Sequence, residues 1–254
     1  MRSRYDVILN GKSLQQLDER LQVIDILHKA AAITDEQHTV AYRHGARLGR
    51  RSIGSVGVTV QFEIHEYSTQ MRASLCDLVG RWAKKGGDLR ASDRPGKQLL
   101  CVCSAYPVIG SAMKWTARLS CEFTAYTIPA WREINPAKKT ITGTSADGQL
   151  YVPGNLDEIP VEVRIRANAA VGSVTLGMNG RQMTLSGLNL STGDEVVIDY
   201  DDELIQRIRK NGVSILERRS GVDDLLANGG ELNVITLTAD GAVDATFSAR
   251  GWWA

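Results

Sequence analysis

The chain has 254 residues, of which 43% are hydrophobic and 23% are charged, the ordinary balance of a globular protein. Its 30 Lys and Arg against 29 Asp and Glu give a net charge of +1, which argues against a protein that coats nucleic acid. No apolar run reaches the roughly 18 residues of a membrane span. The first residues also lack a signal-peptide core, so we expect no membrane insertion.

The charges are distributed unevenly along the chain. Residues 1–136 carry 19 basic and 13 acidic side chains, a net of +6, whereas residues 137–254 carry 11 and 16, a net of −5. Four of the six prolines fall between residues 129 and 160. This shift predicts two domains, 1–136 and 137–254. The opposite charges fit either attraction between surfaces or two separately solvated surfaces.

The first predicted elements come before residue 54. Tyr5–Leu9 is typical of a short strand that ends at the turn dipeptide Asn10-Gly11. Residues 17–27 fit a helix or a strand equally well. Residues 28–49 are polar without clean periodicity, which predicts a long loop or an extended arm.

The pattern is clearer from residue 55 onward. Apolar and polar residues alternate over 56–64, which predicts a half-buried strand. Ser68 then offers an N-cap for an amphipathic helix over 69–84, which Gly86-Gly87 ends. Further strands are expected at 99–104 and 115–125. The first domain is therefore predicted to be strands around one principal α-helix.

The second domain contains no convincing long helix. Short alternating runs end at the hairpin dipeptides Asn179-Gly180, Asn211-Gly212 and Asp240-Gly241. Many short strands joined in this way are typical of an antiparallel β-sandwich or jelly roll. The predicted fold class is thus mainly β, with the α-helix confined to the first domain.

Two motifs could carry chemistry in the first domain. Gly11-Lys12-Ser13 resembles the end of a phosphate-binding loop, but Asp6 stands where that loop needs a glycine. Cys101 and Cys103 share one face of a predicted strand, with Cys121 on a possible neighbour. We interpret these cysteines as core residues; a metal or redox site and a disulfide are the alternatives.

Acidic pairs are the remaining candidates for catalysis, at Asp157-Glu158, Asp194-Glu195, Asp201-Asp202 and Asp223-Asp224. A glycosidase needs two carboxylates that face each other, whereas adjacent strand residues point to opposite faces. Solvated turns are the favoured interpretation, and a calcium or sugar site on the rim of the sandwich is the alternative. The sequence therefore predicts a protein that is not an enzyme, without catalytic, cofactor-binding or metal-binding residues.

A cluster of basic residues lies in the predicted arm: Arg43, Arg47, Arg50 and Arg51. It fits a solvated arm, a protein interface or a phosphate-binding surface, and no aromatic residues interleave with it as in single-strand binding. These four arginines are our candidates for a subunit interface. At the other end of the chain, Trp252-Trp253 is expected to pack on the sandwich or on a partner.

Taken in order, these segments resemble the distal tail protein (Dit) family of long-tailed, siphovirus-type bacteriophages. The resemblance spans nearly the whole chain and depends on the order of short motifs. Arg43–Leu48 is similar to an arginine-and-glycine segment whose usual form is closer to Gly-Arg-Asp-Gly. The other matching segments are Val7–Gly11, the strand 56–64, the helix 69–84, Phe123–Trp131, Asn155–Ile165, Val197–Tyr200 and Gly229–Asn233.

The resemblance implies a structural virion protein of the phage tail tip or baseplate. Relatives form a closed ring, commonly a hexamer, that joins the tail tube to the tip and the host-recognition apparatus. It implies a tail-tube-like, ring-forming domain followed by a galectin-like or jelly-roll sandwich. The implied partners are further copies of the chain, the tail tube protein, the tail-tip hub protein, the tape-measure protein and receptor-binding proteins, without sequence-specific nucleic acid.

The resemblance also implies synthesis in the cytoplasm of the host bacterium and a final location in the virion. The alternative function is a carbohydrate-binding β-sandwich module that attaches to the host surface. No sugar-binding residues carry over to this sequence, and a fold does not by itself imply a function.

Overall fold

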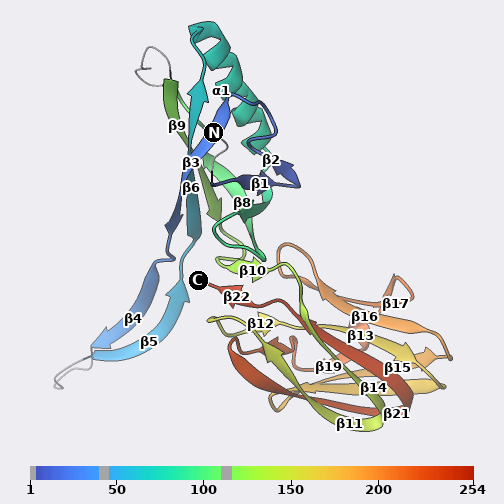
Figure 1. Ribbon diagram of the computed structural model, residues 1–254. Coiled ribbons are helices and arrows are strands. Elements are labelled where there is room, and N and C mark those ends of the chain that lie inside the picture. Colours follow the sequence, from blue (N-terminus) through green and yellow to red (C-terminus); the bar gives the residue numbers. More distant parts are fainter. Residues whose placement is uncertain (1–3, 40–45, 110–115) are drawn as a thin grey trace. The chain divides into compact units, whose positions relative to one another are not determined.

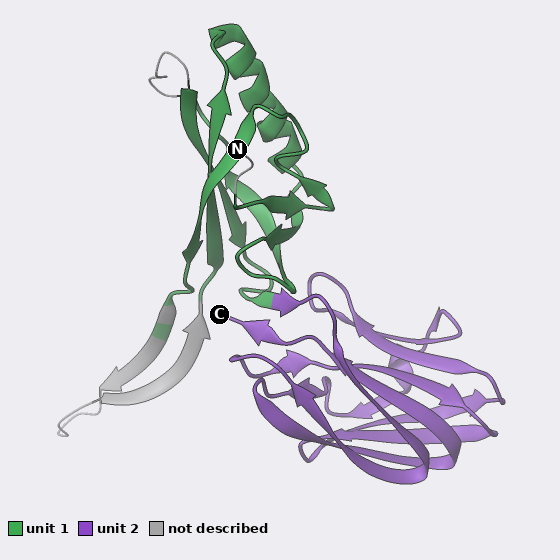
Figure 2. Ribbon diagram, viewed as in Figure 1, with its two compact units in different colours: residues 1–131, 254 green, residues 132–253 purple. Residues whose placement is uncertain are grey.

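The computed structural model describes residues 4–39, 46–109 and 116–254, which form two compact units (Figures 1 and 2). Unit 1 extends to Trp131 and includes Ala254, and unit 2 is Arg132–Trp253. The division lies near the predicted domain boundary at 136/137. The separate roles predicted for the two domains stay a prediction.

Unit 1 is built on a curled antiparallel sheet with the strand order β2-β1-β7-β8-β9-β6-β3. Side chains that alternate along β6 and β9 fill its core, including Phe62 and Phe123, because one face of each strand is turned away from water. The strands of the sheet are β1 (Val7–Leu9), β2 (Lys12–Ser13), β3 (Leu21–Lys29), β6 (Val56–His65), β7 (Gly87–Ala91), β8 (Lys97–Ala105) and β9 (Thr116–Ala125).

The turn between β1 and β2 is the hairpin predicted at Asn10-Gly11. Both residues have positive φ, 50° and 79°, as a tight two-residue hairpin requires. Lys12 and Ser13 belong to β2, so this segment forms part of a hairpin and not a phosphate-binding loop. The segment 17–27, which fitted helix or strand, contributes to β3.

Helix α1 (Thr69–Ala83) confirms the predicted amphipathic helix. The Ser68 side chain accepts a hydrogen bond from the Met71 amide, as an N-cap does. Leu75 and Val79 are buried, and the Trp82 ring meets Phe123 of β9 edge-on at 5.9 Å, so the apolar face of the helix packs on the sheet. In the described part of the chain, no helix is long and apolar enough to span a membrane.

Of the two structures predicted for residues 28–49, the long loop is wrong, whereas the extended arm fits the strands found there. This part of the chain contains the end of β3 and the hairpin of β4 (Ile33–Thr39) and β5 (Ala46–Ile53). The two strands pair from Ile33 opposite Ile53 to Thr39 opposite Ala46, with a shift in register after Asp35. A largely polar hairpin is held by its backbone ladder, so its sequence lacks the apolar alternation by which strands are predicted.

Unit 2 is a β-sandwich-like fold in which the sheets curl around one apolar core, as predicted for the second domain. The hairpin turns at Asn179-Gly180 and Asn211-Gly212 are confirmed, since all four residues have positive φ. Its elements are β11 (Ala137–Val152), β12 (Ile159–Pro160), β13 (Glu162–Ala167), β14 (Val171–Met178), β15 (Arg181–Leu190), β16 (Glu195–Tyr200), β17 (Gln206–Lys210), β18 (Val213–Ser214), η1 (Leu216–Arg218), β19 (Arg219–Gly221), β20 (Leu226–Ala227), β21 (Glu231–Ala249) and β22 (Trp252–Trp253). A short strand, β10 (Trp131–Glu133), pairs with β22.

The hairpin predicted at Asp240-Gly241 is wrong, because β21 runs without interruption from Glu231 to Ala249. One edge of β21 pairs with β11, while the other pairs first with β14 and then with β13. The Asp240 carboxylate accepts a hydrogen bond from the Gly172 amide. A Cβ on Gly241 would lie 2.2 Å from the Ala170 carbonyl oxygen. The glycine therefore permits a close approach of two chain segments.

Candidate subunit interface

The predicted interface arginines belong to the segment that forms the hairpin β4–β5. Arg47 and Arg51 lie on β5 opposite His38 and Asp35 of β4, and Arg50 lies on the same strand. Arg43 falls in 40–45, outside the described residues, and the side chains of the other three arginines also lie outside the described part. The structure therefore places three of the four arginines on one strand and leaves their role a prediction.

The hairpin begins where β3 and β6 end their pairing. These strands pair from Leu21 opposite Ile64 to Lys29 opposite Gly57. Beyond that point, the Gly54 amide donates a hydrogen bond to the Ala32 carbonyl oxygen at 2.7 Å.

Side chains of unit 1 hold the end of β3 firmly. His28 Nε2 lies 2.6 Å from an Asp93 carboxylate oxygen, and its ring meets the fully buried Trp131 ring edge-on at 5.4 Å. The Arg94 guanidinium lies 5.2 Å from the centre of the same indole, as in a cation–π contact. These contacts join the end of β3, which continues toward the hairpin, to the rest of unit 1.

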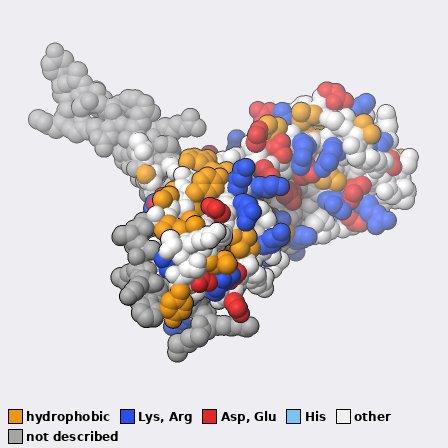
Figure 3. Space-filling view, turned by 90° about the horizontal axis from the view of Figure 1, so that it is seen from above, with side chains coloured by type: hydrophobic (Ala, Val, Ile, Leu, Met, Phe, Trp, Pro, Cys, Tyr) orange, Lys and Arg blue, Asp and Glu red, His pale blue; other side chains and the backbone are white. Residues whose placement is uncertain are grey.

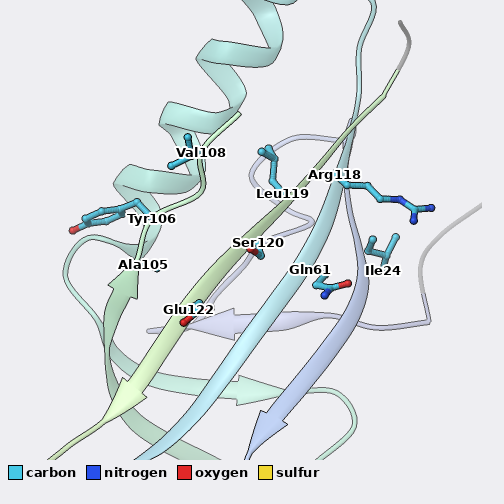
Figure 4. Close-up of a pocket in the computed structure, with 9 residues that line it drawn as sticks. All are labelled: Ile24, Gln61, Ala105, Tyr106, Val108, Arg118, Leu119, Ser120 and Glu122. Carbon is cyan, nitrogen blue, oxygen red and sulfur yellow. The ribbon is translucent and has the colours of Figure 1, made fainter. Parts of the chain in front are cut away.

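The face of the sheet opposite the core is polar and hollowed. Residues of β6 and β9 carry the ion pair between Glu63 and Arg118, whose Nε and Oε1 atoms are 2.5 Å apart. Next to it is a groove of about 500 Å³ (Figure 4), and the exposed Tyr106 and Val108, after β8, form one side of it. The groove is lined by Ile24, Gln61, Ala105, Tyr106, Val108, Arg118, Leu119, Ser120 and Glu122.

Besides the edge of the short terminal strand β2, the sheet of unit 1 has two longer edges that lack a neighbouring strand in the described part of the chain. β9 pairs with β6 along its whole length but with β8 only over Glu122–Thr124. No strand in the described part of the chain pairs with the other edge of residues 116–121, nor with the edge of β3 that faces away from β6. Unpaired strand edges bind extended segments of other chains, so both edges are candidates for contact between subunits.

The cysteines are mostly core residues, as predicted. Cys76, Cys101 and Cys121 are buried and Cys103 is half-buried, and all four are free thiols. Burial raises the pKa of Cys101 to about 12. Among the described residues there is no group of three or more His, Cys, Asp or Glu that could hold a metal ion.

The acidic pairs of unit 2 make local contacts in turns. An Asp201 carboxylate oxygen accepts from the amides of Glu203 and Ile205, and Asp194 accepts from the amide of Ser191. The Ser191 bond is the main cause of the lowered pKa of Asp194. Asp223 forms an ion pair with Arg219 at 2.8 Å. Turn stabilisation therefore accounts for Asp194 and Asp201, and an ion pair accounts for Asp223.

The outer face of one sheet of unit 2 carries a second groove, of about 450 Å³. Arg164 in its lining pairs with Glu195 at 3.3 Å, and Asp199 pairs with both Arg207 and Arg209. Figure 3 shows basic and acidic side chains intermingled on the visible face of unit 2. The net charge of −5 in residues 137–254 is therefore not a uniform acidic surface on this face.

The C-terminal tryptophans are half-buried, as expected for packed side chains. Trp252 packs against the apolar core of unit 2, and Trp253 Nε1 donates to Glu133 Oε1 at 3.0 Å.

Sequence reasoning missed the groove and the open edge of β9. Alternation of Ala117, Leu119 and Cys121 predicts the strand, but an open edge depends on where the neighbouring strand ends. The register shift after Cys103, where β8 leaves β9, has no signal in the sequence.

No protein-family model matches the chain, and no curated protein matches it. Solved structures do match. The chain is similar to the crystal structure of SPP1 Dit, described as a paradigm of the hub adsorption apparatus in phages that infect Gram-positive bacteria. The TM-score is 0.72 at 12% identity, and the match covers 97% of this chain and 98% of that one.

It is also similar to a chain of the phage P2 baseplate in its activated conformation with Ca, with a TM-score of 0.50 at 11% identity and 97% of each chain covered. The mainly β fold predicted from the sequence is thus confirmed, and it is shared with the structure of SPP1 Dit.

Proposed function

We propose that the chain is a structural subunit of a phage tail tip or baseplate, one of six identical subunits that close into a ring.

 The likeness to SPP1 Dit carries the proposal, because it extends over 97% of this chain and so includes both units. The ring would join the tail tube to the tip and the host-recognition apparatus.

The sheet edges of unit 1 support a ring. A closed ring of identical subunits needs a heterologous interface, in which two different patches of each subunit meet. The open edge of β3 and the open edge of β9 over residues 116–121 are two such patches on one sheet. We therefore assign ring formation to residues 1–136, and we propose that residues 137–254 are an outward-facing β-sandwich of galectin-like or jelly-roll type.

The hairpin β4–β5 is the proposed site of a further contact, through Arg43, Arg47, Arg50 and Arg51. Arginine is suited to an interface because its guanidinium binds carboxylates through two parallel hydrogen bonds. Attraction between exposed charges falls with ionic strength, since the Debye length shrinks from about 10 Å at 0.1 M salt to about 3 Å at 1 M. The proposed contact should therefore weaken in high salt.

Native mass spectrometry of the purified chain tests the proposal. We expect a complex of six copies of the 27.8 kDa chain. The double variant Arg50→Glu/Arg51→Glu should shift the population toward smaller species. The control Lys139→Glu/Arg181→Glu makes the same charge change at exposed residues of unit 2 and should leave the complex intact. A chain that stays monomeric at every concentration would contradict the ring, and equal effects of both variants would contradict the role of the hairpin.

The proposed partners are the tail tube protein, the tail-tip hub protein, the tape-measure protein and receptor-binding proteins. The proposed location is the virion, after synthesis in the host cytoplasm, and the proposed role is not enzymatic. Antibody labelling of virions should place the chain at the tip of the tail. Labelling elsewhere on the particle would contradict this location.

A carbohydrate-binding role of unit 2 is the second candidate, and the polar groove beside Arg164 favours it. Glycan-array screening of the full chain tests this role, with Arg164→Ala as the groove variant and Arg181→Ala as an exposed control. Binding that only the groove variant loses would support it. Silence across the array would leave unit 2 with a structural role.

A further inference from the structure

Two cysteines of neighbouring strands touch each other in unit 1. Cys103 lies near the end of β8 and Cys121 in the middle of β9. Cys103 stands opposite Phe123 in the register, so Cys121 is its diagonal neighbour on the same face of the sheet. The two Sγ atoms are 3.6 Å apart, in van der Waals contact and without a covalent bond.

The two thiols differ in their access to solvent. Cys121 is 1% exposed, whereas Cys103 is half-buried. Carbonyl oxygens lie near three of the thiols: Cys76 Sγ lies 3.2 Å from that of Pro107, Cys101 Sγ 3.6 Å from that of Gly87, and Cys103 Sγ 3.4 Å from that of Ala105. A small oxidant therefore reaches one member of the pair, and the second member is already in contact with it.

We propose that Cys103 and Cys121 form an oxidation site, which a peroxide converts from two thiols into an intrachain disulfide. The Cys103 thiolate attacks one oxygen of the peroxide and forms an S–O bond, the O–O bond breaks, the other oxygen leaves as water, and Cys103 becomes a sulfenic acid. The Cys121 sulfur then attacks the Cys103 sulfur, the S–O bond breaks, and the oxygen leaves as a second water. Two thiols lose two electrons and two protons, which one peroxide takes up.

The bond requires a local movement of the backbone, because diagonal neighbours on paired strands are about 7–8 Å apart and a disulfide needs its Cα atoms within about 7 Å. A disulfide needs its sulfurs about 2.05 Å apart, so the pair must close by about 1.5 Å. The register shift between Cys103 and Ala105 leaves Ser104 out of the β8–β9 ladder. This interruption lies directly beside Cys103 and is where we expect the movement to occur. The bond would then fasten β8 to β9 at the point where their pairing ends.

The pair should react slowly near neutral pH. Burial raises the pKa of both thiols, so each is almost entirely protonated there, and the thiolate is the reactive form. The rate of disulfide formation should rise about tenfold per pH unit below the thiol pKa. In a reducing cytoplasm the pair stays a dithiol. That oxidation follows release of the virion from the cell is the part that rests on the proposed function.

Peptide mapping of the purified chain after treatment with hydrogen peroxide tests the proposal. Trypsin separates the pair, because it yields one peptide of residues 98–114 and another of residues 119–132. We expect these two peptides linked, with two hydrogens lost. Fragmentation between Cys101 and Cys103 identifies the linked sulfur, and Cys76 should remain free to react with an alkylating agent after unfolding.

The variant Cys121→Ser should stop the reaction at the sulfenic acid of Cys103, which dimedone labels, whereas Cys76→Ser should still form the disulfide. Four free thiols after prolonged oxidation at alkaline pH, a bond through Cys101, or Cys103 oxidised without a link to Cys121 would each overturn the proposal. Ring formation by the reduced protein is measured separately, so a failure here is distinguishable from a failure of the proposed function.

Discussion

Asn233 is a buried polar residue whose replacement should destabilise unit 2. It is 1% exposed and lies on β21. Its Oδ1 accepts hydrogen bonds from Asn179 Nδ2 at 2.8 Å and from the Asn228 amide at 2.7 Å. Its Nδ2 faces the carbonyl oxygens of Leu150, Asn228 and Glu231 at 3.0 to 3.3 Å. The side chain thus joins β11, β21 and two turns.

The magnitude follows from the groups that lose their partner. Asn233→Ala removes the acceptor of two donors, and each buried donor left without a partner costs about 1–3 kcal/mol. Because the two donor sites are partly buried, we expect a loss of about 2–4 kcal/mol in the free energy of unfolding. Asn233→Asp has almost the same shape but places an oxygen against three carbonyl oxygens. It should therefore cost more than Asn233→Ala.

Urea titration read by hydrogen exchange of peptides from β21 measures the effect on unit 2 alone. The control Leu232→Ala changes the neighbouring side chain, which is 62% exposed, and should stay within about 0.5 kcal/mol of the unchanged chain. A loss below about 1 kcal/mol for Asn233→Ala would refute this reasoning. So would an Asn233→Asp variant that is no less stable than Asn233→Ala.

Two further predictions concern stability. Gly241→Ala should lower the free energy of unfolding by about 1–3 kcal/mol, because its Cβ would meet the Ala170 carbonyl oxygen, whereas Gly80→Ala has open space in α1 and should gain up to about 1 kcal/mol. Urea titrations of both variants check this pair, and equal effects would contradict the close approach at Gly241. The Arg20 guanidinium donates to the Asp18 carboxylate and lowers the pKa of Asp18 to about 2. Since this folded-state pKa is depressed, the stabilisation is present above about pH 4 and is lost as the pH falls toward 2. An NMR titration of Asp18 should show its pKa return toward 3.8 in Arg20→Met, and an unchanged midpoint would count against the assignment.

Alternation and turn residues were enough to predict much of the fold. The strand at 56–64, the helix after Ser68 and the Asn-Gly hairpins have local causes that a sequence displays. Asp240-Gly241 has the same local signal as those hairpins, yet the glycine serves an approach between distant segments. Such a contact is decided by the tertiary fold and not by the dipeptide.

Strand β11 of unit 2 and the candidate interface of unit 1 were less accessible to sequence reasoning. β11 has sixteen residues but buries only Ile141, Leu150 and Val152, and the hairpin β4–β5 is largely polar, so neither shows strand periodicity. The open edge over residues 116–121 results from the early end of β8 pairing. The arginine cluster was visible in the sequence, but its place on a hairpin was not.

Electron-microscopy class averages of the purified chain, viewed along its symmetry axis, test the central claim most directly. The account predicts closed rings with six-fold symmetry, formed through the two different sheet edges of unit 1. Particles that remain single subunits at every concentration, or open filaments in place of rings, would contradict it.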